Sequence, residues 1–215
     1  MVRQFSLKAV RILFPLILHM LAAVLTGELL SFFRAGVSPV WIAVAADGIC
    51  IPVFLYLYRK RKPEYDYRKI TKPHGKPLLF AAAFLSGAAA SILSNRIIDI
   101  AGLTEHFPSA ILGELQKLPF MMQIAGLSVI VPVAEELLYR GLVRNEIRLF
   151  TGRRVSALVS AALFAIGHGN ILQALFAFPM GLWLAFCQDF GGIGAAIACH
   201  IGYNLASAAA AALFH

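Results

Sequence analysis

Long apolar stretches separated by short polar segments constrain the fold of this chain more than any other feature. A stretch of roughly 17 to 25 apolar residues can cross a bilayer as a helix. Hydrophobic residues make up 60% of the chain and charged residues 14%, whereas about a quarter of a soluble domain is charged. We therefore predict an all-α fold, a polytopic membrane helical bundle with about seven to eight transmembrane helices. The seven candidate stretches are residues 10–33, 40–58, 78–94, 119–139, 155–170, 171–187 and 191–214.

The basic residues predict how these segments are oriented in the membrane. Three lie at the start of the chain, eight in residues 59–76 and five in residues 140–154. If all seven stretches cross, these groups share one side, and only Arg34, Arg96 and Lys117 lie opposite. Cytoplasmic loops are enriched in Lys and Arg, so we expect a cytoplasmic N-terminus in a multi-pass integral membrane protein. An eighth segment could lie within residues 96–117.

The same distribution bears on partners and cofactors. The basic residues lie between apolar runs and form no continuous face, so we expect membrane lipids as partners and no nucleic acid. The three cysteines, Cys50, Cys187 and Cys199, have no CxxC spacing, which argues against a disulfide framework or a cysteine zinc site. No internal repeat divides the chain, and we predict a single integral membrane domain over residues 1–215.

The first of three polar patterns is Glu135-Glu136 followed by Arg140, at the end of an apolar run. Glu136 and Arg140 are four residues apart and can form an ion pair on one helix face. Glu135 is rotated by about 100° from Glu136 on a helix, so its carboxylate can point into a cavity and act as a general base toward water. Alternatively, both are interfacial glutamates neutralised by nearby arginines.

The other two patterns place imidazoles in apolar helices. Phe164 and His168 are four residues apart, as are His200 and Asn204. An imidazole and an amide at that spacing share a helix face and could stabilise an oxyanion. Taken singly, His168 could be a satisfied packing residue, and the His200–Asn204 pair could form hydrogen bonds between helices. Ionisable residues within a membrane are costly and usually functional, and the joint occurrence of all three patterns favours one shared site.

The order EExxxR, FxxxH, HxxxN on successive apolar helices resembles the CPBP family, the CAAX-protease and bacteriocin-processing (Abi) membrane proteins that include type II CAAX prenyl endopeptidases. The likeness covers roughly residues 119–208, which we take as a CPBP-like catalytic core, and the residues before it carry no comparable signature. It implies an intramembrane endopeptidase of glutamate type. Its substrate would be a membrane-associated or lipidated protein cleaved near its C-terminus.

The resemblance also implies a role for each residue of the site. Glu135 would activate water with help from His168, while His200 and Asn204 would stabilise the oxyanion. The supporting residues would be Glu136, Arg140 and Phe164. We expect no metal, because HExxH is absent and an asparagine is a poor zinc ligand. Catalytic zinc needs three protein ligands, and the alternative is a zinc metalloprotease that uses Glu135, His168 and His200.

Two further functions stay open at this point. A non-catalytic membrane scaffold or immunity-type binding protein of the same fold would keep the helices without using the site for hydrolysis. A small transporter could use buried Glu and His to relay protons, but no paired half-repeats or broken helices are evident in the sequence.

Overall fold

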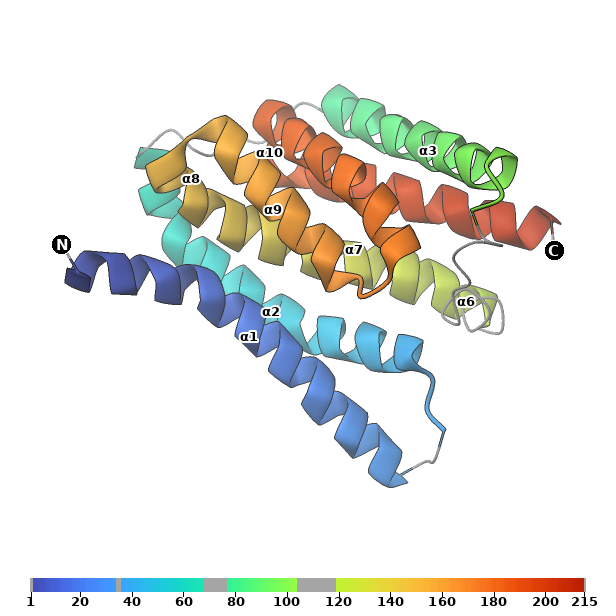
Figure 1. The fold of residues 1–215 in the computed structure, drawn as a ribbon, viewed down its shortest axis with the longest axis horizontal. Coiled ribbons are helices and arrows are strands. Elements are labelled where there is room, and N and C mark those ends of the chain that lie inside the picture. The colour runs from blue at the N-terminus through green and yellow to red at the C-terminus, as the bar shows by residue number, and fades with distance from the viewer. Residues whose placement is uncertain (1, 34–35, 68–76, 104–118, 215) are drawn as a thin grey trace.

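The computed structural model describes residues 2–33, 36–67, 77–103 and 119–214, and every regular element within them is a helix (Figure 1). This confirms the all-α prediction. The elements in chain order are α1 (Val2–Phe33), α2 (Pro39–Tyr67), α3 (Pro77–Ile100), α6 (Phe120–Met122), η1 (Gln123–Ile130), α7 (Val131–Glu135), η2 (Glu136–Arg144), α8 (Asn145–Thr151), α9 (Arg153–Gly167) and α10 (Ile171–Phe214).

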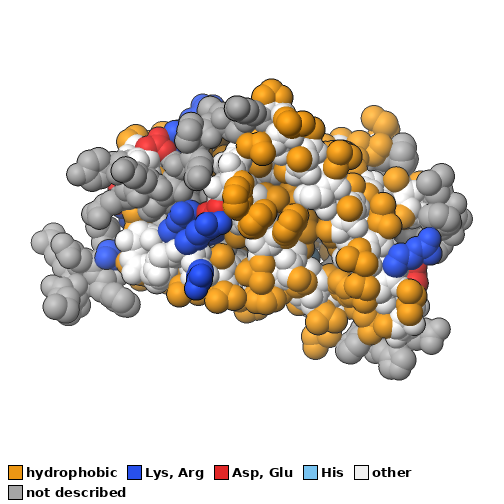
Figure 2. Space-filling model, turned by 90° about the horizontal axis from the view of Figure 1, so that it is seen from above, with side chains coloured by type: hydrophobic (Ala, Val, Ile, Leu, Met, Phe, Trp, Pro, Cys, Tyr) orange, Lys and Arg blue, Asp and Glu red, His pale blue; other side chains and the backbone are white. Residues whose placement is uncertain are grey.

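All seven apolar stretches are largely helical, and within the described residues four helices are long and apolar enough to cross a bilayer. Those four are α1, α2, α3 and α10. Large apolar side chains on the outer faces of these helices are exposed; Phe32 is 83% exposed and Ile100 is 86% exposed. Figure 2 shows hydrophobic side chains across much of one face. Surfaces of this kind suit lipid contact, and the chain is an integral membrane protein. The larger count of seven to eight crossings stays a prediction, and residues 104–117 of the possible eighth segment lie outside the described residues.

Helix α2 is longer than the sequence predicted. We expected its apolar span to end at residue 58 and a basic loop to follow, but the helix continues to Tyr67. Polar contacts hold this extension in place: Lys62 pairs with Asp66 one turn away at 2.6 Å, and the buried Tyr65 hydroxyl donates to Glu146 at 2.7 Å. The first basic residues of the expected loop, 59–62, are therefore helical.

The two predicted C-terminal stretches form α10, whose arms meet at a sharp reversal. Gly192 has φ 74°, a left-handed conformation that glycine adopts at little cost. The arms 171–191 and 193–214 fold back along each other, as Figure 1 shows in orange and red. The turn expected at Gly167, Gly169 and Asn170 also occurs, with Gly169 at φ 64° and the Asn170 side chain capping the backbone N–H of Gln173 at 3.1 Å.

The second arm of α10 packs closely against α3, and small residues make this approach possible. A Cβ atom on Gly87 would overlap the carbonyl of Cys199, and one on Gly202 would overlap the carbonyl of Phe84. Glycine at such crossings lets two backbones come together in lipid. This contact fixes the helix face that carries His200.

Two carboxylates tie the helices together at the end of the molecule where the basic residues gather. Glu146 accepts from Arg11 and Arg61, and Asp189 accepts from a set of three arginines: Arg144, Arg148 and Arg153. Both carboxylates are buried, and a buried charge is stable only when it is paired. These contacts join α1, α2, η2, α8, α9 and α10 below the predicted cytoplasmic surface.

Candidate functional site

The two glutamates lie where one long helical run changes its backbone geometry. Residues 120–151 are helical throughout, and the segments η1 and η2 are π-helical, with α7 between them. Glu135 is the last residue of α7 and Glu136 the first of η2. A π-helical turn widens the helix and often accompanies a functional site. The sequence predicted a plain apolar helix here, because a π-helical segment has no simple sequence signature.

The imidazole of His200 lies between the two carboxylates. Its Nδ1 atom is 3.0 Å from Oε1 of Glu136, and its Nε2 atom is 3.6 Å from Oε2 of Glu135. The first distance is a hydrogen bond, and the second is a charge contact. With a proton on Nδ1 directed at Glu136, Nε2 is the nitrogen that faces Glu135.

The carboxylate of Glu135 is the more accessible of the two. Its side chain is 17% exposed, whereas that of Glu136 is 0% exposed. A general base must reach the water that it activates, so exposure separates the two adjacent glutamates. Glu135 suits proton transfer, and Glu136 suits a buried structural charge.

Glu136 and Arg140 form the ion pair that the spacing predicted. Nη1 of Arg140 lies 2.9 Å from Oε1 of Glu136, and both side chains are completely buried. A second guanidinium nitrogen donates to the carbonyl of Gly181 at 3.2 Å. Arg140 therefore joins its own helix to the first arm of α10 while it balances the charge of Glu136.

Phe164 is the aromatic centre of the site. Its ring lies edge-on to both imidazoles, with centroids 4.8 Å from His168 and 5.7 Å from His200. The guanidinium of Arg140 sits over the same ring at 4.4 Å, a cation–π contact strengthened by burial. Phe164 thus fixes the positions of three polar side chains around it.

His168 lies beside this cluster and makes no ion pair with Glu135 among the described residues. Its Nδ1 atom is 2.8 Å from the carbonyl of Phe164. A proton on Nδ1 directed at this carbonyl would leave Nε2 as the nitrogen able to accept. The proposed help of His168 to Glu135 therefore stays a prediction, with Phe164 as its contact to the rest of the site.

Asn204 lies one turn beyond His200, and its side chain is already engaged. Nδ2 donates to the carbonyl of Leu127 in η1 at 2.8 Å. This is the hydrogen bond between helices that the sequence left open as the alternative to oxyanion binding. The amide carries a second N–H, so the contact with Leu127 leaves one donor for a substrate carbonyl.

One further side chain at the site was missed from the sequence. The ring of Tyr139 lies edge-on to Phe164 at 5.3 Å, and its hydroxyl is against Gly167, where an added Cβ would lie 2.5 Å away. Tyr139 is four residues after Glu135, on the same side of the helix. The four-residue spacing from Glu135 was the available sequence signal for Tyr139, but a tyrosine beside a predicted ion pair is most simply interpreted as a packing residue.

The zinc alternative finds little support in the arrangement of these side chains. Within the described part of the chain, no three His, Cys, Asp or Glu side chains come together as a metal-binding group. Glu135 contacts His200, but His168 forms no ion pair with Glu135 among the described residues. These residues do not fit a three-ligand zinc site, and no step below runs through a metal.

Comparison with known proteins identifies the region that contains this site. Residues 117–206, somewhat less than half of the chain, match a family model described as "Type II CAAX prenyl endopeptidase Rce1-like". The match includes all three polar patterns, the first arm of α10, the Gly192 reversal and the second arm as far as residue 206. No curated protein and no solved structure matches the chain.

Proposed function

Because residues 117–206 belong to the Rce1-like family of type II CAAX prenyl endopeptidases, we propose that the chain is an intramembrane endopeptidase of glutamate type. Its substrate is a membrane-associated or lipidated protein, which it cleaves near the C-terminus. The observation that carries this proposal is the contact of a partly exposed Glu135 carboxylate with the His200 imidazole at 3.6 Å.

In the proposed reaction Glu135 accepts a proton from water, and the resulting hydroxide attacks the carbonyl carbon of the scissile peptide bond. The negative charge then develops on the carbonyl oxygen, where an N–H of Asn204 and, with protons on both ring nitrogens, the Nε2–H of His200 stabilise it. Collapse of the tetrahedral intermediate breaks the carbon–nitrogen bond, and Glu135 returns its proton to the leaving amine. His168, which contacts the Phe164 ring, helps Glu135 to activate the water.

The supporting residues hold this arrangement together. Glu136 orients the His200 ring through Nδ1, and Arg140 neutralises the charge of Glu136. A residue that fixes the tautomer and direction of an imidazole contributes to the reaction without touching the substrate. We assign this positioning role to Glu136, and Arg140 supports it.

The direct test is a search for one uncut protein. Membranes from cells with wild-type protein are compared by C-terminal proteomics with membranes from cells with Glu135→Gln. A protein that keeps its C-terminal tail only in the Glu135→Gln membranes is the substrate. Glu28→Gln is the matched control, because Glu28 is an exposed acidic residue of α1. An identical set of C-termini in all three membranes would contradict the proposal and favour the non-catalytic binding function.

A further inference from the structure

A second acid–imidazole pair lies in the N-terminal helices, outside the three polar patterns. Nε2 of His19 in α1 is 2.6 Å from Oδ1 of Asp47 in α2. The Asp47 side chain is 5% exposed and that of His19 is 26% exposed. A buried carboxylate needs a partner, and His19 supplies it. Pairing alone, however, does not explain why both groups lie at this particular point.

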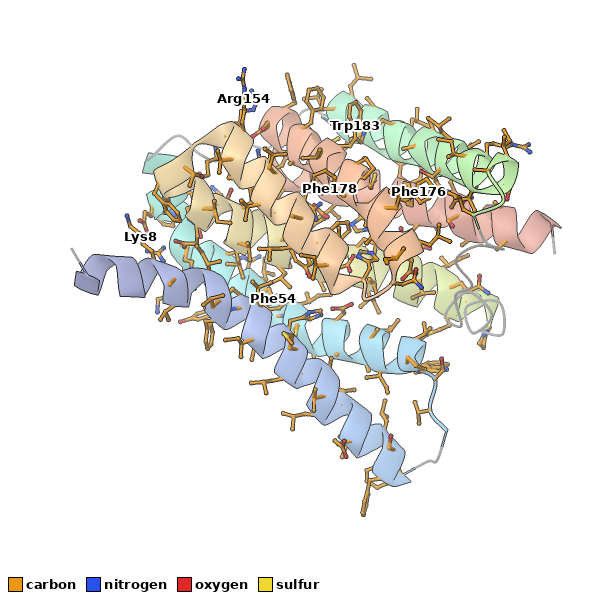
Figure 3. All side chains as sticks on the ribbon, viewed as in Figure 1. Lys8, Phe54, Arg154, Phe176, Phe178 and Trp183 are labelled. Atoms are coloured by element: carbon orange, nitrogen blue, oxygen red, sulfur yellow. The ribbon has the colours of Figure 1, made fainter. Side chains whose placement is uncertain are left out.

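The contacts of α2 place this pair beside the helix that carries Glu135. Helix α2 packs against α7 and η2. At Gly48, next to Asp47, an added Cβ would lie 3.9 Å from the side chain of Ile130, the residue before α7. Further along α2, Phe54 belongs to the same buried cluster as Tyr139. The ring of His19 lies 6.2 Å from that of Phe54, which Figure 3 labels where α1 and α2 approach each other.

The packing of α2 against α7 brings both members of the pair into the surroundings of Glu135. The Asp47 carboxylate and the His19 imidazole each lie within range of its charge. Asp47 also lies within range of the Tyr139 hydroxyl. The charged groups that face Glu135 therefore come from four elements, α1, α2, η2 and α10: His19, Asp47, Glu136, Arg140 and His200.

We propose that the His19–Asp47 pair is a positioning device of the Glu135 site, by which α1 and α2 hold the buried Asp47 carboxylate near the base. A neighbouring negative charge makes a carboxylate more ready to hold a proton taken from water. His19 holds Asp47 in place, and its imidazole is the more exposed member of the pair. This inference rests on the proposed function, since it assigns the pair a role in the same reaction.

The first test does not depend on proteolysis. The thermal unfolding of purified full-length protein in detergent is measured for Asp47→Asn, Glu135→Gln and the double variant. Because two nearby carboxylates interact, the Tm change of the double variant should differ from the sum of the single changes by about 2 °C or more. Thr26→Val replaces another buried polar residue of α1, and its effect should be additive with Glu135→Gln. Additive changes for Asp47→Asn as well would overturn the proposal.

The second test uses the cleavage rate of the substrate identified above. Asp47→Asn should lower kcat about tenfold with KM unchanged, and Asp47→Glu should restore most of the rate. Combining His19→Gln with Asp47→Asn should cost no more than Asp47→Asn alone, because the pair acts as a unit. A wild-type kcat in Asp47→Asn, or a raised KM with kcat unchanged, would overturn the positioning role. If wild-type protein cleaves nothing, the proposed function fails, and the unfolding measurements alone decide whether the pair is coupled to Glu135.

Discussion

His200 contacts Glu136 through Nδ1 at 3.0 Å, and this hydrogen bond determines which ring nitrogen faces Glu135, the proposed general base. His200 forms its hydrogen bond with the fully buried glutamate, whereas the partly exposed Glu135 has only a longer contact, 3.6 Å, with Nε2. Two chemically identical neighbours in the sequence thus differ in burial and in their contact with His200, and this difference supports the separate tasks that we propose for them.

Replacement of Glu135 by Gln should abolish cleavage while the protein still accumulates in the membrane. The amide cannot accept the proton from water, and loss of a general base lowers kcat by about 100- to 10,000-fold. Cleavage of the tail-bearing substrate by purified protein measures the loss. Glu28→Gln should cleave at the wild-type rate, and retained activity in Glu135→Gln would reject the assigned base.

Replacement of Arg140 by Leu should destabilise the protein strongly. The change leaves the buried Glu136 carboxylate without its guanidinium partner, and breaking a buried ion pair in this way costs about 3 to 5 kcal/mol. Lysine should rescue poorly, because it cannot contact Glu136 and the Gly181 carbonyl with separate nitrogens of one planar group. Thermal unfolding in detergent measures the effect. Removal of the exposed Lys62–Asp66 pair by Lys62→Ala is the control and should cost no more than about 1 kcal/mol.

Replacement of Asn204 by Ala separates its two possible contributions. Loss of the hydrogen bond to the Leu127 carbonyl should lower stability by about 1 kcal/mol, whereas loss of an oxyanion donor should lower kcat by about 100- to 1,000-fold. Asn170→Ala removes only the cap of α10 and should lower stability without changing kcat. A kcat for Asn204→Ala as high as that of Asn170→Ala would show that Asn204 serves packing alone.

A single methyl group at the crossing of α3 and α10 should disturb the site from outside it. Ala at Gly87 or Gly202 would force the two backbones apart. Gly202 is two residues after His200, and Gly87 packs against the carbonyl of Cys199, the residue before His200. We expect a lower Tm together with lower activity. Gly27→Ala is the matched control, since its Cβ would meet Ile42 at an ordinary 3.5 Å. Wild-type behaviour of Gly202→Ala would contradict the close packing.

Treatment with a strong chelator should leave the cleavage rate unchanged. Glu135, His168 and His200 do not form a three-ligand group in this structure, and the proposed base acts on water directly. The measurement compares purified protein before chelation, after chelation and after metal is restored. Loss of activity that returns with zinc would overturn the glutamate mechanism in favour of the metalloprotease alternative.

The fold class and the candidate residues of the site could be predicted from the amino-acid sequence. Apolar stretches of membrane-spanning length can satisfy their backbone hydrogen bonds only as helices in lipid, so the helical bundle follows from composition and segment length. The four-residue spacing of Glu136 and Arg140 likewise predicts their ion pair, because neighbours on a helix are set by local geometry. The patterns around Glu135, His168 and His200 also identified the region that the family match covers.

How these residues meet could not be predicted without the packing of the helices. The contacts of His200 with both glutamates, the anchoring of Arg140 to Gly181, and the pairing of His19 with Asp47 all join residues far apart in the chain. Such contacts depend on how each helix is rotated and where it crosses its neighbours. Rotation and crossing are set by packing across whole helix faces, as at Gly87 and Gly202, and by the reversal at Gly192, so no local spacing in the sequence specifies them.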